Sequence, residues 1–363
     1  MGETQSTGEE DILNALRSVT DPELGRDIVS LNMVKNVAAC DGRVRVKVEL
    51  TTPACPLKDR IRGDVEAAVR QLPGVKQVEV DFSAQVRRGP LAPLSLPGVK
   101  NVVAVGAGKG GVGKSAVSVL VAVGLARAGA KVGLLDADVY GPSIPKMLGV
   151  EDRSPVIAGE RILPVQACGI SVISMGFILK PEQAVIWRGP MIHNTVRQFL
   201  EQVDWGDLDY LIVDLPPGTG DVPLTLSQSI PMTGAVVVCT PQDVALLDAV
   251  RAARMYQQLN VQVLGIIENM SYFIAPDTGR EYDLFGKGGA ERAARRLGLP
   301  FLGSIPINIA IRVSGDAGTP ESIFKDNPQG IGEALTRIVE ALAGQISVRN
   351  RPESEQLKMN IQA

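Results

Sequence analysis

Hydrophobic and polar residues follow two kinds of pattern in the first part of the chain, over residues 9–82. The stretch 43–50, RVRVKVEL, alternates strictly between polar and apolar residues, which predicts a strand with one buried face. Apolar residues then recur at helical spacing from Val65 to Leu72, where a Pro-Gly pair ends the predicted helix. An amphipathic stretch precedes these elements and an alternating one follows. The pattern predicts a small α+β domain.

After residue 98 the pattern changes to short runs of valine and isoleucine that alternate with helical stretches. Continuously apolar strands separated by helices are typical of a parallel sheet that is covered on both faces. The predicted fold class is therefore α/β, with a mostly parallel sheet, preceded by the small α+β domain. The predicted strands are residues 101–106, 131–136, 170–174, 210–214, 235–240, 262–267 and 301–304.

The composition between the two patterns indicates a linker. Residues 87–98, RRGPLAPLSLPG, are rich in proline and glycine and show no hydrophobic period. We therefore predict a first domain over residues 9–86, a linker over 87–98, a second domain over 99–345 and a flexible tail over 346–363.

The charge balance narrows the choice of partners. Among 363 residues, 37 are Lys or Arg and 40 are Asp or Glu, which gives a net charge of −3. This balance does not favour a nucleic acid or an anionic membrane as partner, and neither is predicted. The acidic N-terminus does not resemble a secretory signal, and the most apolar run, residues 117–126, is too short to cross a bilayer. The expected compartment is the cytoplasm.

Four cysteines and one histidine limit the metal chemistry of the chain. No two cysteines form a C-x-x-C pair, so a self-contained zinc module and a disulfide scaffold are both excluded. Cys239 ends a valine-rich strand and is interpreted as a core residue. His193 lies on a predicted helix and is interpreted as a packing residue.

The strongest chemical signal follows the first strand of the second domain. Residues 108–115, GKGGVGKS, match the G-x-x-x-x-G-K-S pattern of a phosphate-binding loop, and a long apolar helix follows them. Glycines let backbone N–H groups turn toward an anion, and the helix N-terminus adds positive potential. We expect Lys114 to contact the β and γ phosphates of ATP and Ser115 to bind Mg²⁺. The predicted nucleotide-binding residues of this loop are Gly108, Lys109, Gly110, Gly111, Val112, Gly113, Lys114 and Ser115.

Acidic residues follow two other predicted strands. Asp136 and Asp138 stand at the carboxyl end of one strand, and Asp214 ends another. In a parallel sheet these ends face the same edge as the phosphate loop. Asp214 is predicted to hold Mg²⁺ through water, and Asp136 is a second candidate for that role.

Several motifs together resemble one family of ATPases. The sequence KGGVGKS from Lys109 is similar to the deviant phosphate loop of the MinD/ParA/nitrogenase-iron-protein group. Further segments narrow the resemblance to the Mrp/ApbC family of iron–sulfur cluster carrier ATPases, over residues 99 to about 340. These segments are DADVYGPSIP from Asp136, WRGPM from Trp187, DLPPGTGD from Asp214 and ENMSYF from Glu268.

The resemblance implies a homodimer with nucleotide at or near its interface, in which Lys109 reaches the phosphates bound by the partner. It also implies that Asp138 orients the attacking water and that Asn269 contacts adenine. We expect slow Mg²⁺-dependent ATP hydrolysis in which Lys109, Lys114 and Asp138 are catalytic. The partners implied are iron–sulfur scaffold proteins or apo-client proteins.

The first domain also carries a resemblance. The segments DPE from Asp21 and TTPACP at 51–56 look like the small iron–sulfur assembly domain that is fused ahead of Mrp-type ATPases. Pro56 suits the first turn of a helix, which places Cys55 at or just before the helix N-terminus, where the dipole favours a thiolate. Cys55 is therefore a candidate iron–sulfur ligand. The alternative is a cysteine that packs as a small hydrophobic side chain.

The chain departs from the family pattern at the expected cluster ligands. The family has a C-x-x-C pair after the NMSYF segment, and two such pairs would bridge a 4Fe–4S cluster. Here Ala275 and Thr278 stand at those positions, and neither supplies a thiolate. Three functions stay open: an ATP-dependent iron–sulfur cluster carrier or assembly factor, a cluster-free nucleotide-switch regulator, and a positioning ATPase of the MinD/ParA kind. The tail lacks the basic amphipathic pattern that the last of these needs at a membrane.

Overall fold

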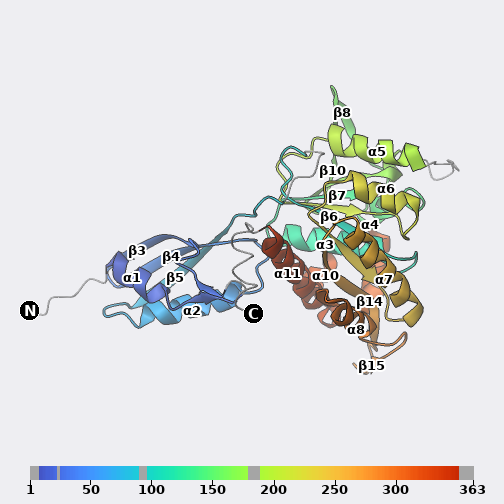
Figure 1. Cartoon of the computed structure of the whole chain (residues 1–363). Helices are drawn as coiled ribbons and strands as arrows, with labels where there is room; N and C mark the ends of the chain where they lie inside the picture. Colours follow the sequence, from blue (N-terminus) through green and yellow to red (C-terminus); the bar gives the residue numbers. More distant parts are fainter. Residues whose placement is uncertain (1–7, 23–24, 90–95, 179–188, 351–363) are drawn as a thin grey trace, which may run out of the picture. The chain divides into compact units, whose positions relative to one another are not determined.

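The structure is a computed structural model that describes residues 8–22, 25–89, 96–178 and 189–350 (Figure 1). The chain divides into two compact units, Met1–Val86 and Arg87–Ala363. Trp187, part of one motif above, lies outside the described residues.

The first unit is a three-stranded sheet packed against two helices. Its strand order is β3-β4-β5, with β3 and β4 antiparallel and β4 and β5 parallel. The strict alternation predicted for residues 43–50 is confirmed, because the valines and the leucine of β4 are buried and the charged residues between them face outward. The elements are α1 (Glu9–Leu16), β1 (Thr20–Asp21), β2 (Arg26–Asp27), β3 (Val34–Cys40), β4 (Arg43–Leu50), α2 (Lys58–Arg70) and β5 (Gln77–Ala84).

The second unit is built on one sheet of the order β10-β11-β7-β12-β6-β13-β14-β15, with β16 also paired to β14. The strands from β11 to β14, together with β16, are parallel to their neighbours, whereas β10 and β15 are antiparallel. The predicted mostly parallel sheet is therefore confirmed. The strands are β6 (Val102–Gly106), β7 (Val132–Asp136), β10 (Val165–Ala167), β11 (Ile170–Ser174), β12 (Tyr210–Asp214), β13 (Gly234–Cys239), β14 (Val263–Ile274), β15 (Glu281–Tyr282) and β16 (Phe301–Ile307).

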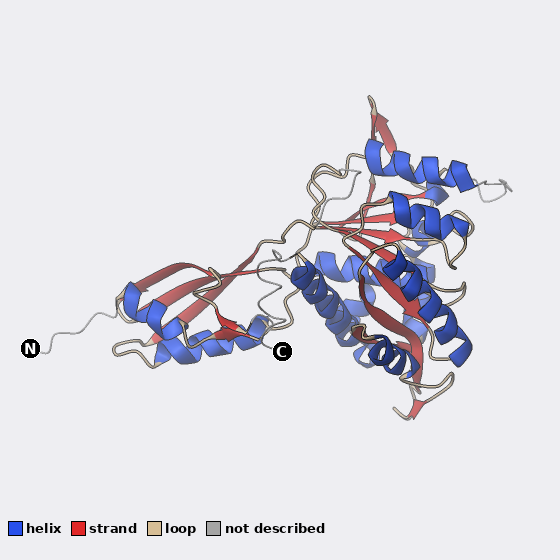
Figure 2. Cartoon of the chain, in the orientation of Figure 1, coloured by secondary structure: helices blue, strands red, loops and turns tan. Residues whose placement is uncertain are grey.

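Helices cover both faces of this sheet (Figures 1 and 2). One face packs against α5, α6, α7 and α8, and the other against α3 and α11, with α4, α9 and α10 beside them. Because α3 lies between the sheet and α11, it is apolar on nearly all sides. The helices are α3 (Lys114–Arg127), α4 (Ile144–Met147), α5 (Gly189–Gln202), α6 (Asp221–Ser229), α7 (Asp243–Gln258), α8 (Gly289–Leu297), α9 (Ile309–Ala317), α10 (Ser322–Asp326) and α11 (Ile331–Arg349).

Two boundaries differ from the sequence prediction. Strand β14 continues to Ile274, well past the predicted end at residue 267, because its polar second half pairs with β15 and β16. Asn269 therefore lies inside this strand and not after it. Helix α11 continues to Arg349, into the segment predicted to be a tail, because apolar residues such as Ile346 are still buried there.

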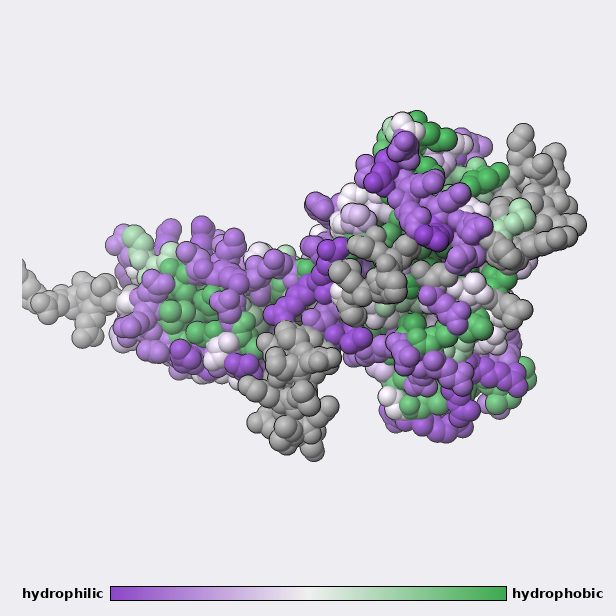
Figure 3. All heavy atoms as spheres, turned by 45° about the horizontal axis from the view of Figure 1, so that its top comes forward, coloured by the Kyte–Doolittle hydropathy of each residue, from purple (hydrophilic) through white to green (hydrophobic). Residues whose placement is uncertain are grey.

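The surface includes features that the hydrophobic pattern did not predict. A short hairpin, β8 (Val156–Ala158) and β9 (Arg161–Leu163), carries exposed apolar side chains. Figure 3 shows hydrophobic side chains as separate patches among hydrophilic ones. Over the part of the chain that the structure describes, no helix has both the length and the apolar character needed to span a membrane.

Candidate functional site

The phosphate loop connects the end of β6 to the first turn of α3, as its spacing predicts. Gly111 and Gly113 have φ values of 80° and 78°, in the left-handed region that favours glycine. Gly108 is required for a different reason. A Cβ atom there would lie 2.2 Å from the carbonyl oxygen of Asp248 on α7. The glycines are therefore dictated by backbone conformation and by close packing.

Four predicted site residues meet at this edge of the sheet. Lys114 begins α3 and is only 6% exposed. Its Nζ lies 2.6 Å from Oδ2 of Asp214 and 3.5 Å from Oδ2 of Asp138. Ser115 Oγ donates a hydrogen bond of 2.6 Å to the same Oδ2 of Asp214. The parallel register of β6, β7 and β12 thus brings together residues that are up to a hundred positions apart.

The oxygen donors at this point suit Mg²⁺. A serine hydroxyl and a carboxylate within hydrogen-bond distance of each other, at the start of a helix, are hard ligands of the kind that Mg²⁺ takes from proteins. Asp214 is fully buried, and its charge is balanced by the ammonium group of Lys114. Ser115 and Asp214 are therefore the pair of side chains that would hold the metal.

Asp136 differs from Asp214 in its environment. It is fully buried, and it accepts hydrogen bonds from Ser174 Oγ at 2.8 Å and from the Asp138 N–H at 3.2 Å. Burial, followed by the nearby charge of Asp214, raises the pKa of Asp136 to about 8. Asp214 contacts both Lys114 and Ser115 of the phosphate loop, so it is better placed than Asp136 to hold Mg²⁺ there.

Asn269 contacts the phosphate loop itself. Its Nδ2 donates a 2.8 Å hydrogen bond to the carbonyl oxygen of Val112. A Cβ atom on Gly113 would lie 2.3 Å from that same nitrogen. Strand β14 therefore packs directly against the loop. The contact of Asn269 with adenine stays a prediction.

Comparison with known families agrees with this geometry. A model described as the NUBPL iron-transfer P-loop NTPase matches residues 98–343. The chain belongs to this family. A second model, described as an iron–sulfur cluster assembly protein, matches residues 9–82.

Individual relatives of this iron-transfer NTPase support the assignment. An iron–sulfur cluster carrier protein of Synechocystis sp. is 52% identical over 345 residues, which cover 93% of this chain and 97% of that protein. The structure of a nucleotide-binding protein from Archaeoglobus fulgidus in complex with ADP is 43% identical, with a TM-score of 0.57, over 62% of this chain and 89% of that one. The cell division ATPase MinD of Pyrococcus furiosus shares the fold, with a TM-score of 0.51 at 22% identity over 66% of this chain and 97% of that one. The resemblance to Mrp/ApbC carriers is confirmed.

Glu268 is a buried carboxylate that begins the ENMSYF motif and to which the sequence assigned no role of its own. It accepts hydrogen bonds from the N–H groups of Gly288 and Ala290, at 2.9 and 2.7 Å, and from the hydroxyl of Ser271. Because Ala290 lies in the first turn of α8, Glu268 fixes this helix to β14. These bonds connect the two ends of the segment between Glu268 and Ala290, which includes Ala275.

The positions of the missing cysteine pair lie where β14 turns into β15. Ala275 is buried at the end of β14, and Thr278 is exposed in the turn. The turn is tight, because the Gly279 N–H donates to the Ala275 carbonyl and the Ala275 N–H donates to the Arg280 carbonyl, both at 2.9 Å. Among the described residues, no group of three or more His, Cys, Asp or Glu side chains is placed to hold a metal ion.

Cys55 lies further from the helix than predicted. Helix α2 begins at Lys58 and not at Pro56, and the Lys58 N–H bonds to the Cys55 carbonyl in a turn before it. The effect of a helix dipole falls off within the first turn, so its influence on Cys55 is smaller than the sequence indicates. The side chain is half-buried against the core of the first unit.

Two other cysteines are held as thiols. Cys239 is buried in β13, as predicted, and burial raises its pKa to about 12. Cys168 donates a hydrogen bond to Glu321, and burial together with this carboxylate raises its pKa to about 12. Neither thiol is suited to act as a thiolate ligand. The remaining cysteine, Cys40, is exposed.

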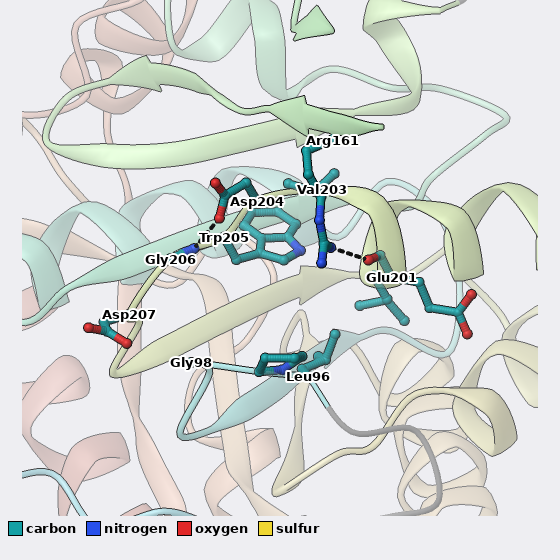
Figure 4. A pocket seen from close by; sticks show the side chains of 11 residues that line it. Leu96, Gly98, Arg161, Glu201, Val203, Asp204, Trp205, Gly206 and Asp207 are labelled. Carbon is teal, nitrogen blue, oxygen red and sulfur yellow. Dashed lines mark hydrogen bonds between the residues drawn. The ribbon is translucent and has the colours of Figure 1, made fainter. Parts of the chain in front are cut away.

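A cavity of about 410 Å³ lies at the opposite edge of the sheet, before the start of β12 (Figure 4). Three of the polar groups that line it are hydrogen-bonded within the protein. Arg161 donates to the Glu201 carbonyl at 2.8 Å, the Gly206 N–H donates to Asp204 at 3.3 Å, and Trp205 donates to the Phe199 carbonyl at 3.1 Å. Because these three donors already have acceptors, we assign the cavity no ligand.

Proposed function

We propose that this protein is an ATP-hydrolysing iron–sulfur cluster carrier. The observation that supports the proposal most directly is the convergence of Lys114, Ser115 and Asp214 beside a phosphate loop, in a chain that belongs to an iron-transfer family. The relative named as a carrier in Synechocystis matches both units of the chain.

The site is arranged to stabilise charge on a triphosphate. The N–H groups of the loop and the ammonium group of Lys114 would contact the β and γ phosphates, where negative charge increases during hydrolysis. Ser115 and Asp214 would hold Mg²⁺, which neutralises phosphate charge when bound. Asp138 is buried and lies 3.5 Å from Lys114 Nζ, and its Oδ1 accepts a hydrogen bond from the Tyr140 N–H. Each oxygen of this carboxylate can accept a second hydrogen bond, so Asp138 would be able to orient a water molecule.

The proposal includes a homodimer with Lys109 near the partner's nucleotide. Lys109 is partly exposed on the phosphate loop. Exposed apolar side chains lie close by on α7, where Val244 is 67% and Leu247 60% exposed, next to the Asp248 carbonyl that touches Gly108. Apolar groups exposed beside a charged site favour a protein partner at this edge.

Replacing Lys109 by alanine is expected to lower ATP hydrolysis by at least about 10-fold while ATP binding changes less, because the partner's phosphates lose a positive charge only in the dimer. Phosphate release and nucleotide affinity are measured separately, with Lys131→Ala as a control on another loop. Mixed dimers of Lys109→Ala and Lys114→Ala chains add a sharper readout. If Lys109 acts in the partner's site, each mixed dimer has one complete site and one site that lacks both lysines, so mixing restores activity that neither variant has alone. Wild-type activity of Lys109→Ala rules out this role.

The carrier function is tested by transfer of a cluster. The protein is loaded anaerobically with iron and sulfide and then mixed with an apo-ferredoxin, and the visible spectrum of the ferredoxin is followed with and without Mg-ATP. We expect holo-ferredoxin to form faster than from the same iron and sulfide free in solution. Transfer at the rate of the free reagents contradicts the carrier function.

A second candidate function rests on Ala275 and Thr278. Because these residues leave the second unit without the thiolates of its family, a cluster-free nucleotide switch is the alternative. It predicts ATP hydrolysis without any iron retained after desalting, so the loading step of the same experiment separates the two functions.

A further inference from the structure

Ser118 lies on the second turn of α3 and contacts Asp214 of the site. It is fully buried (0% exposed), in a helix whose neighbouring residues are nearly all apolar. Its Oγ is 2.6 Å from Oδ1 of Asp214 and 3.1 Å from the carbonyl oxygen of Lys114. A hydroxyl has one proton to donate, and the shorter, charge-assisted bond to the carboxylate is the stronger of the two.

The two oxygens of Asp214 are thus held from different sides. Oδ2 accepts hydrogen bonds from Lys114 and Ser115, both on the side of the phosphate loop. Oδ1 accepts the bond from Ser118. Because each oxygen has a donor, the carboxylate cannot rotate without breaking one of them. Ser118 therefore helps to hold the carboxylate with Oδ2 toward Lys114 and Ser115.

We infer that Ser118 is a positioning residue of the magnesium site, acting through Asp214. The inference rests on the proposed function, because it concerns the metal that ATP hydrolysis requires. Without the hydroxyl, Oδ1 becomes a buried acceptor without its donor, which is costly for a charged group. The carboxylate is then expected to turn toward the remaining donors, so that Oδ2 no longer presents the same lone pairs. Residues that orient a metal ligand typically change metal affinity or activity by about 10- to 100-fold.

The test compares Ser118→Ala with Ser118→Thr, which keeps the hydroxyl. Binding of Mn²⁺ in the presence of ADP is measured by the loss of the free-ion signal in electron paramagnetic resonance, and the Mg²⁺ dependence of ATP hydrolysis is measured in parallel. We expect Ser118→Ala to weaken Mn²⁺ binding by at least about 10-fold. We expect Ser118→Thr to restore most of the affinity. The KM for ATP at saturating Mg²⁺ should change little.

Ser314→Ala is the matched control, because Ser314 is also a buried helical serine whose hydroxyl bonds to a backbone carbonyl, but lies on α9. It should leave Mn²⁺ binding unchanged. If Ser118→Ala does not fold, Ser118→Cys replaces the hydroxyl by a somewhat larger and weaker donor, and its Mn²⁺ affinity decides. Wild-type affinity in a folded variant overturns the inference. A wild-type protein that hydrolyses no ATP with Mg²⁺ contradicts the proposed function instead.

Discussion

Replacing Lys114 by alanine is expected to lower the rate of ATP hydrolysis by at least about 100-fold. The ammonium group lies beside Asp214 and Asp138 and is almost fully buried, so neither water nor another side chain takes its place easily. Its charge acts where the β and γ phosphates would lie, and electrostatic stabilisation is strongest in such a buried site. The measurement is phosphate release at saturating Mg-ATP.

Lys146→Ala is the matched control for this prediction. The side chain of Lys146 is 62% exposed and pairs with Glu151 at 2.7 Å, away from the phosphate loop. Its removal should leave the rate of ATP hydrolysis unchanged, because an exposed ion pair contributes little to the stability of the fold. Lys114→Ala also leaves buried carboxylates without their cation, so thermal unfolding is recorded for both variants. A folded Lys114→Ala protein with wild-type activity shows that the phosphate site is assigned wrongly.

The parallel strands could be predicted from the sequence because they are buried on both faces. Residues such as Val103 and Ile212 lie in continuous apolar runs. Such a run can be recognised in the sequence without knowing which strands lie beside it. The second half of β14 does not follow this rule. Glu268 and Ser271 are polar and yet fully buried, because the bonds that satisfy Glu268 come in part from Gly288 and Ala290, on the far side of a long loop.

The residues of the phosphate site also divide into those that the sequence predicts and those that it does not. Lys114 and Ser115 belong to a local spacing pattern, and Asp214 follows from the topology of a parallel sheet, so these three could be predicted. Ser118 and Ser174 could not be predicted, because each has a role only through its hydrogen bond to a carboxylate that lies far away in the sequence. A polar residue inside an otherwise apolar helix was the available signal for Ser118, since a buried hydroxyl needs a partner.

The cysteines show where sequence reasoning about chemistry has to be corrected by geometry. Proline at position 56 is compatible with a helix start, but the chain makes a turn first and α2 begins at Lys58. The helix dipole therefore stabilises a Cys55 thiolate less than a helix start at Pro56 would. Cys55 is still a better candidate ligand than Cys168 or Cys239, because burial stabilises the thiol forms of those two residues.

Replacing Cys55 by serine is therefore expected to reduce the iron and sulfide retained after anaerobic reconstitution to the background level. Iron–sulfur clusters are held by thiolates, and Ala275 and Thr278 supply none. Cys239 is buried in β13 and Cys168 donates a hydrogen bond to Glu321, so neither thiol is free to bind a cluster. The remaining candidates are Cys55, which is half-buried, and Cys40, which is exposed.

Cys40→Ser is the matched control, because it removes the other thiol of the first unit without touching its core. Iron and acid-labile sulfide are measured after desalting, and circular dichroism shows whether each variant is folded. We expect Cys40→Ser to keep the wild-type iron content, because Cys40 is exposed at the end of β3, whereas Cys55 lies in the segment that resembles the iron–sulfur assembly domain. Equal iron in wild type and Cys55→Ser excludes Cys55 as a ligand. No iron in the wild type favours the cluster-free switch, since a chain that hydrolyses ATP but retains no cluster has kept only the nucleotide half of its family's chemistry.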